Sequence, residues 1–200
     1  MKTRFTAMRL IVSCALSLFS LLPLFTVAQD YVEWDEYRDL SVDDFQQALY
    51  LKHVETFRFQ NGLELRLEYR TTMLDSTFFD KLNTSVVCMF FPYRAMLQNK
   101  DNAPLNDLLE LANVQFDLAE VNTRRIRRFL SENPSIWSSQ RSMRVWFDKF
   151  YKNWKKQDKK LAKKSDHGLK KDVLDKWRER ISEEMEYLAD YCYSCSLSEE

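Results

Sequence analysis

The period of the apolar residues changes once along the chain, at Pro104, and this change restricts the possible folds. Before Pro104, short segments alternate between apolar and polar residues or are continuously apolar, which is typical of strands. After Pro104, apolar residues recur at every third or fourth position, which is typical of amphipathic helices. Strands followed by helices predict an α+β fold with a small antiparallel sheet, rather than a doubly wound one.

Three segments before Pro104 are predicted to form the sheet. Residues 54–59 and 63–70 alternate, and Asn61-Gly62 between them tolerates positive φ, so we expect these two segments to pair as a β-hairpin. Residues 84–93 are continuously apolar, which favours a more central strand. Residues 30–47 are expected to form a strand and a turn that pack onto the rest through Trp34, Leu40, Val42 and Phe45.

Three helices are predicted after Pro104. Residues 131–134 end the first, the second begins near Ser139, and the loop at 165–168 precedes the third. In the first helix, the apolar stripe is interrupted only by Thr123. Its members are Leu105, Leu109, Ala112, Phe116, Ala119, Ile126 and Leu130. The inward side chains of the other two are Met143, Trp146, Phe150, Trp154 and Leu161, then Val173, Leu174, Trp177, Ile181, Met185 and Leu188.

The N-terminus has the pattern of a cleavable secretory signal peptide, residues 1–28. Three cations precede an apolar run over residues 10–27, and Thr26-Val27-Ala28 offers the small side chains that signal peptidase reads. An uncleaved anchor is the alternative, because about 18 apolar residues nearly span a bilayer. Pro23 interrupts the run and favours cleavage. We therefore expect an exported, periplasmic or extracellular protein whose residues 29–200 form one domain without a transmembrane segment.

Charge is distributed unevenly along the chain. Without residues 1–28, 27 Lys and Arg face 30 Asp and Glu, and the net charge of −3 does not suggest a general polyanion partner. Residues 29–123 hold 17 acidic and 8 basic side chains, whereas residues 141–180 hold 15 basic and 6 acidic ones. We interpret the basic stretch as a solvated helix face; a surface for nucleic acid or anionic lipid is the alternative, and export disfavours nucleic acid. Its lysines are Lys155, Lys156, Lys159, Lys160, Lys163 and Lys164.

Three cysteines remain after signal cleavage: Cys88, Cys192 and Cys195. An odd number in an oxidising compartment predicts one disulfide and one spare thiol, with the pairing open. Cys192 and Cys195 have the two-residue spacing of a redox motif. They do not open a helix after a strand, where such thiols are activated, so a structural or unpaired role is favoured.

Residues 108–120 read Leu-Leu-Glu-Leu-Ala-Asn-Val-Gln-Phe-Asp-Leu-Ala-Glu, and basic residues follow at 124, 125 and 127. This stretch resembles a bacterial family of secreted, zinc-protease-like proteins without assigned function, whose helix has the form Leu-Leu-x-His-Glu-Gln-x-His-Phe-Asp-x-x-Glu. Two further stretches are similar to that family. They are residues 39–45, like its Leu-Thr-Trp-x-Asp-Phe, and the Ser165-Asp166-His167-Gly168 loop leading to Trp177 and Ile181. The resemblance implies a zincin-like helix in a protease-like domain.

The chain departs from that family at the residues that would carry the chemistry. In a His-Glu-x-x-His helix, two imidazoles bind zinc and the glutamate accepts a proton from the metal-bound water. Here Leu111, Ala112 and Gln115 stand at those positions, within Leu111-Ala112-Asn113-Val114-Gln115. Leucine and alanine have no donor atoms, so we expect no catalysis there and no bound metal or other cofactor.

Asp117, Glu120 and His167 are the candidates for a remnant site. For the two carboxylates, salt bridges to Arg124 and its neighbours at helical spacing are favoured. For His167, an exposed position at a helix entry is favoured. The sequence thus predicts an exported, catalytically inactive, metalloprotease-like protein that binds a peptide or protein of the cell envelope. The alternatives are an active zinc-dependent hydrolase with these atypical ligands, and a structural envelope protein unrelated to proteases.

Overall fold

The computed structural model describes residues 31–45, 58–60, 63–67, 86–98, 105–192 and 195. The predicted signal peptide and parts of the predicted strands lie outside these ranges. Within them, two small antiparallel sheets and three α-helices form the α+β fold that the sequence predicts. No helix in the described ranges combines the length and apolarity needed to cross a bilayer.

The three helices lie where the apolar period places them. They are α3 (Leu105–Glu132), α4 (Gln140–Lys164) and α5 (Lys171–Tyr187). A 3-10 turn, Pro134–Ser138, separates α3 from α4, and the Ser139 side chain caps α4 by accepting a hydrogen bond from the Ser142 backbone N–H at 3.4 Å. Thr123 does not interrupt the buried stripe of α3, because its hydroxyl donates to the Ala119 carbonyl at 3.0 Å.

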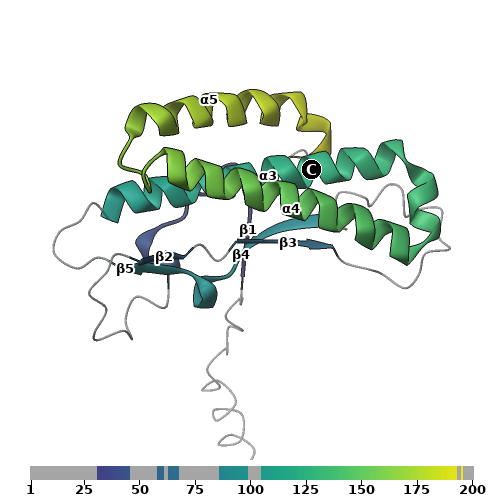
Figure 1. Cartoon of the computed structure of the whole chain (residues 1–200), viewed down its shortest axis with the longest axis horizontal. Coiled ribbons are helices and arrows are strands. Elements are labelled where there is room, and N and C mark those ends of the chain that lie inside the picture. The colour runs from purple at the N-terminus through teal and green to yellow at the C-terminus, as the bar shows by residue number, and fades with distance from the viewer. Residues whose placement is uncertain are drawn as a thin grey trace, which may run out of the picture.

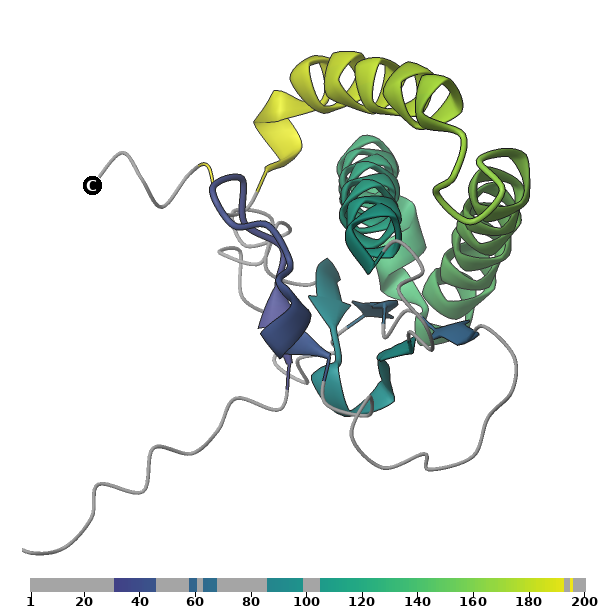
Figure 2. The same cartoon turned by 90° about the vertical axis from the view of Figure 1, so that its left-hand side faces the viewer.

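Helix α3 is the centre of the molecule. Figure 2 shows it between the strands on one side and α4 and α5 on the other. More than half of its residues are therefore buried, on every face of the helix. They include six polar or charged side chains, Gln115, Glu120, Asn122, Thr123, Arg124 and Arg127.

The three-stranded sheet has the order β1-β4-β3, with β1 at Val32–Glu33, β4 at Val86–Phe90 and β3 at Leu63–Leu67 (Figure 1). The prediction that residues 84–93 supply a central strand is confirmed. A second, two-stranded sheet pairs β2 (Arg58–Gln60) with β5 (Met96–Gln98).

The predicted β-hairpin across Asn61-Gly62 is wrong. β3 pairs with β4 in the register Leu63↔Phe90, and β2 pairs with β5 in the register Gln60↔Met96. Two residues lie between Gln60 and Leu63, whereas five lie between their partners Phe90 and Met96. The difference arises because a 3-10 turn at Pro92–Arg94 is inserted between β4 and β5. β2 and β3 thus run in the same direction, and each pairs with a strand that is distant in sequence, instead of pairing with each other.

The N-terminal segment packs onto the rest as predicted, with one exception. Trp34, Leu40 and Phe45 are buried, and the Trp34 backbone N–H donates to the Cys88 carbonyl at 3.1 Å, beyond the end of β1. Val42 was expected to be buried as well, but it is exposed. It begins a one-turn 3-10 helix, Val42–Asp44, that faces solvent.

The loop between α4 and α5 holds the start of α3 in place. Asp166, His167 and Gly168 all have positive φ, at 51°, 54° and 98°. Gly168 lies so close to α3 that an added Cβ would stand 2.4 Å from the Asp107 carbonyl oxygen and 3.4 Å from the Leu111 Cβ. Only glycine satisfies both the backbone conformation and this contact.

We therefore expect Gly168→Ala to lower the free energy of unfolding by about 2–4 kcal/mol, through backbone strain and displacement of α3. Urea denaturation followed by far-ultraviolet circular dichroism measures this loss. Leu169→Ala changes an exposed neighbour and is the control, with an expected effect within about 0.5 kcal/mol. A Gly168→Ala protein as stable as this control would contradict the described contact.

Candidate functional site

The motif positions of α3 lie in the core. Leu111, Ala112 and Gln115 are at most 2% exposed. Gly168 of the α4–α5 loop lies against Leu111, and the Gln115 amide donates to Asp158 Oδ1 of α4 at 2.5 Å. A substrate cannot reach Leu111 or Gln115 without separating α4 and its loop from α3.

Gln115 keeps this part of the core polar. Its Oε1 atom is buried and accepts no hydrogen bond from the described residues. Trp154 Nε1 of α4 is also buried and donates no hydrogen bond to them. A buried polar atom without a partner costs about 1–3 kcal/mol. Of the three motif positions, Leu111 and Ala112 are therefore apolar, and only Gln115 brings a polar group into the core.

Asn113, in the same stretch, holds the N-terminal segment. Its Oδ1 accepts a hydrogen bond from the Leu40 N–H at 2.7 Å, and its Nδ2 donates to the Leu40 carbonyl at 3.3 Å. The Asn113 amide thus makes the two backbone hydrogen bonds to Leu40 that a neighbouring strand would otherwise make. The sequence does not predict this role of Asn113, because nothing local signals a partner so distant along the chain.

Glu120 is buried between two arginines. Its Oε1 accepts from Arg124 Nε and from Arg127 Nη1, both at 3.0 Å, and all three side chains are at most 4% exposed. The predicted salt bridge to Arg124 is confirmed, and Arg127 is a second partner. Glu120 is thus paired with two cations of its own helix.

The same arginines connect α3 to three other parts of the fold. Arg124 donates to the Met185 carbonyl of α5 at 3.0 Å. Arg127 donates to the Val86 carbonyl of β4 at 2.9 Å and to the Tyr191 carbonyl at 2.8 Å. We call Glu120, Arg124 and Arg127 the buried ion cluster. It connects α3 with the sheet, with α5 and with the C-terminal turn, a 3-10 helix at Ala189–Tyr191.

Asp117 does not pair with Arg124. It is half-buried, and its Oδ1 accepts a hydrogen bond from Trp34 Nε1 at 3.0 Å. Among the described residues, Trp34 is its only hydrogen-bond donor. Burial raises the pKa of the Asp117 carboxyl above its ordinary value, although the Trp34 hydrogen bond opposes the shift.

Asp117 lies in the wall of a cleft of about 350 Å³ between the N-terminal segment and α5. Five carboxylates and two guanidinium groups line this cleft, so it is predominantly negative. Its residues are Trp34, Asp35, Glu36, Arg38, Asp39, Asp117, Arg178, Glu179, Ile181, Ser182 and Met185. We call it the acidic cleft.

His167 does not join Asp117 and Glu120. It is exposed at the entry to α5, as predicted, beside the Gly168 contact with Asp107 and Leu111. Asp117 stands six residues beyond Leu111, or about 9 Å along the helix axis. No group of three or more potential metal-ligating side chains gathers within the described ranges.

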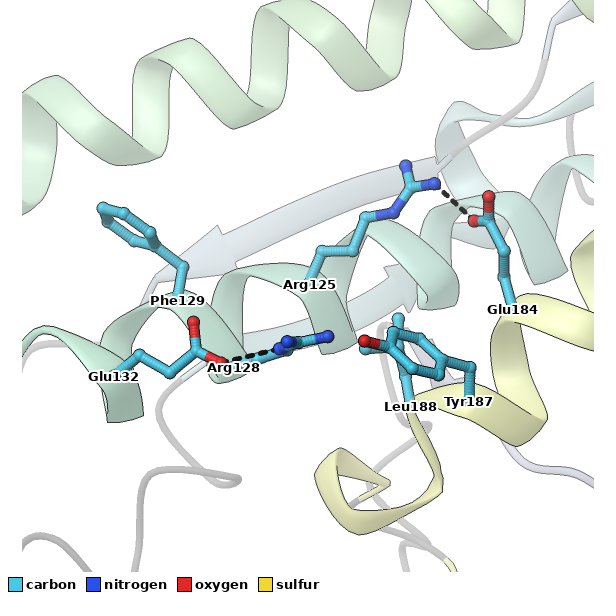
Figure 3. Close-up of a pocket in the computed structure, with 7 residues that line it drawn as sticks. All are labelled: Arg125, Arg128, Phe129, Glu132, Glu184, Tyr187 and Leu188. Carbon is cyan, nitrogen blue, oxygen red and sulfur yellow. Dashed lines mark hydrogen bonds and ion pairs between the residues drawn. The ribbon is translucent and has the colours of Figure 1, made fainter.

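A second cleft, of about 260 Å³, lies between the C-terminal halves of α3 and α5 (Figure 3). Its charged groups are engaged within the protein. Arg125 pairs with Glu184, and Arg128 pairs with Glu132 at 2.8 Å while its guanidinium lies 5.1 Å from the centre of the Tyr187 ring. This cleft is therefore a weaker candidate for ligand binding than the acidic cleft.

The lysines of the basic stretch lie along α4. Five of the six are exposed, and Lys155 is half-buried with its ammonium 4.4 Å from the centre of the Trp154 ring. This arrangement is compatible with the solvated helix face that we expect from the sequence.

The cysteines form one disulfide, between Cys192 and Cys195, and Cys88 is a free thiol buried in β4. The predicted arithmetic of one bridge and one spare thiol is confirmed. Burial raises the pKa of the Cys88 thiol well above its ordinary value, so this thiol remains protonated at neutral pH.

The buried ion cluster gives a stability prediction. Glu120→Ala leaves two buried guanidinium groups without their carboxylate, and we expect the free energy of unfolding to fall by about 3–5 kcal/mol. Glu132→Ala removes an exposed i,i+4 partner of Arg128 and is the matched control, with an expected loss below about 1 kcal/mol. Chemical denaturation of both variants measures the difference, and equal losses would show that the cluster is not essential.

The raised pKa of Asp117 gives a pH prediction. An acid whose pKa is higher in the folded than in the unfolded state costs stability as pH rises through that interval. Asp117→Asn removes this cost and keeps an acceptor for Trp34, so we expect the variant to be the more stable protein at pH 7. The advantage should vanish below about pH 4, near the ordinary pKa of aspartate.

Urea midpoints between pH 3 and pH 8 test this expectation. Asp148→Asn, at an exposed position of α4, is the control and should show no such pH-dependent gain. An Asp117→Asn protein that is less stable than the parent at pH 7 would mean that the carboxylate is stabilised, not penalised, in its site.

Comparisons with protein-family models, with curated proteins and with solved structures found no match to this chain. The resemblance to the zinc-protease-like family therefore rests on the quoted residues and stays a prediction.

Proposed function

We propose that this protein is an exported, catalytically inactive, metalloprotease-like binding protein of the cell envelope, and that its ligand is a peptide or protein segment with a cationic side chain. The observation that carries the proposal is the acidic cleft, with the half-buried carboxylate of Asp117 in its wall. A cation there would offset the cost of keeping this carboxylate ionised.

The position of the motif residues supports the absence of catalysis. A catalytic zinc needs three protein ligands and an open position for water or substrate. Leu111, Ala112 and Gln115 lie instead in the core, with Gln115 bonded to α4, and the acidic cleft is lined by α5 and the N-terminal segment. Binding therefore does not depend on the residues at the family's metal positions.

Peptide titrations test the proposal. The probes are blocked pentapeptides that differ only in the central residue, which is arginine, leucine or glutamate, and the readout is calorimetry on residues 29–200. We expect the arginine peptide to bind best, and Asp117→Asn to weaken its binding at least about tenfold, which corresponds to 1.4 kcal/mol. Glu183→Gln, at an exposed position of α5 outside the cleft, should bind like the parent.

Equal affinities for the three peptides would overturn the assignment of the acidic cleft. Two further measurements on the same samples address the alternative of an active hydrolase with Asp117, Glu120 and His167 as ligands. Near-stoichiometric zinc by elemental mass spectrometry after dialysis against trace zinc, together with cleavage of the peptides, would favour the hydrolase. Intact peptides and metal-free protein are the expected results.

A further inference from the structure

The disulfide has one buried and one accessible sulfur. Cys192 is 2% exposed and lies in the core, whereas Cys195 is partly exposed at the surface. Exchange with an external thiol requires in-line approach to one sulfur, with the other leaving as a thiolate. Cys195 is the accessible sulfur, so it is the one that is attacked, and Cys192 is the leaving group.

Arg124 and the Cys195 backbone both direct a donor at the leaving sulfur. Arg124 Nη2 lies 3.0 Å from Cys192 Sγ, and the Cys195 backbone N–H lies 3.2 Å from it. The guanidinium is buried and fixed by Glu120 and the Met185 carbonyl. A cation and a hydrogen-bond donor both stabilise a thiolate relative to a thiol.

The buried ion cluster is short of negative charge. Among the described residues, Glu120 is the only carboxylate that pairs with Arg124 and Arg127, so one negative charge faces two positive ones. An anion at Cys192 would balance this excess. The cluster therefore favours the dithiol form of the cysteine pair, in which Cys192 is a thiolate.

The surroundings of Cys195 are of opposite sign. Its sulfur lies 3.5 Å from Glu36 Oε2 and 3.9 Å from Arg124 Nη2, which is farther than Cys192 is from the same guanidinium. A carboxylate next to Cys195 favours the thiol at this position. The neighbouring charges thus favour a thiolate at Cys192 and a thiol at Cys195, as an exchange in which Cys192 is the leaving group requires.

We propose that Cys192 and Cys195 form a thiol–disulfide exchange site that oxidises dithiols of other proteins. A substrate thiolate attacks Cys195 Sγ, the Cys192–Cys195 bond breaks, and its electron pair remains on Cys192 as a thiolate. The second substrate thiol, after loss of its proton, attacks the substrate sulfur of the mixed disulfide, and Cys195 leaves and takes up a proton. The substrate loses two electrons and the protein disulfide gains them.

The site lies beside the acidic cleft. Glu36 and Trp34 line that cleft, and the Trp34 ring lies 5.1 Å from the Arg124 guanidinium carbon. Figure 2 shows the N-terminal segment next to the end of the described C-terminal chain, where Cys195 contacts Glu36. The inference does not depend on the proposed function, because the exchange needs only the cysteines and the buried ion cluster.

The first test is the titration of Cys192 in the Cys195→Ser variant of residues 29–200, followed by thiolate absorbance at 240 nm. We expect a midpoint at least one pH unit below the ordinary thiol value of about 8.5. The same variant in concentrated urea is the control, and its midpoint should return to about 8.5, because unfolding separates Cys192 from Arg124. Cys88 is buried in the folded variant, and Cys88→Ala removes its signal from both samples.

The second test is the redox equilibrium of the intact protein with glutathione, quantified by alkylation and mass spectrometry. A synthetic peptide of residues 189–198 is the matched control, because it has the same cysteine spacing without Arg124. We expect the protein to be at least tenfold easier to reduce than the peptide, which is 29.6 mV for a two-electron couple. We also expect the protein to oxidise dithiothreitol, the probe dithiol. The rate should rise in Glu36→Gln, because this change removes the carboxylate next to the attacked sulfur.

Each test can overturn the proposal by itself. A Cys192 midpoint that is the same in the folded and unfolded variant would show that Arg124 does not stabilise the thiolate. A disulfide as resistant to glutathione as the peptide, or more so, would show a purely structural bridge.

Discussion

One buried carboxylate shared by two guanidinium groups determines how the parts of this protein meet. Glu120 fixes Arg124 and Arg127 on α3, and three other donors of these arginines reach backbone carbonyls of β4, of α5 and of the C-terminal turn. Those carbonyls belong to segments that are far apart in sequence. Because a buried guanidinium must satisfy its donors, each of these segments has one position at which it can dock on α3.

The local features of the fold could be predicted from the sequence, and the distant pairings could not. The recurrence of apolar residues at every third or fourth position predicts the helices, because each inward side chain is specified by its neighbours on the same helix. The pairing of Leu63 with Phe90 depends on a turn inserted at Pro92–Arg94, which no alternation within residues 54–70 reveals. Hydrophobic periodicity also missed the burial of Arg127, since a helix enclosed on all sides buries polar residues that its apolar stripe does not mark.

The candidate site divides in the same way. The pattern around Leu111 singles out residues 111–115 of α3, but three alternate residues of this stretch contact different parts of the molecule. Leu111 packs under the Gly168 loop, Asn113 holds Leu40, and Gln115 faces Asp158. The acidic cleft was not predicted, because its walls come from the N-terminal segment and α5, and only their contacts with α3 bring them together.

The anchoring of the N-terminal segment has a consequence for the order of folding. Its backbone is held by Cys88 and by Asn113, so the first described residues of the chain depend on partners that are synthesised much later. The packing of α4 on α3, by contrast, joins two helices that follow each other in the chain. Contacts between distant residues carry the larger cost in chain entropy, so the helical half should form first and serve as the template on which β1 is added last.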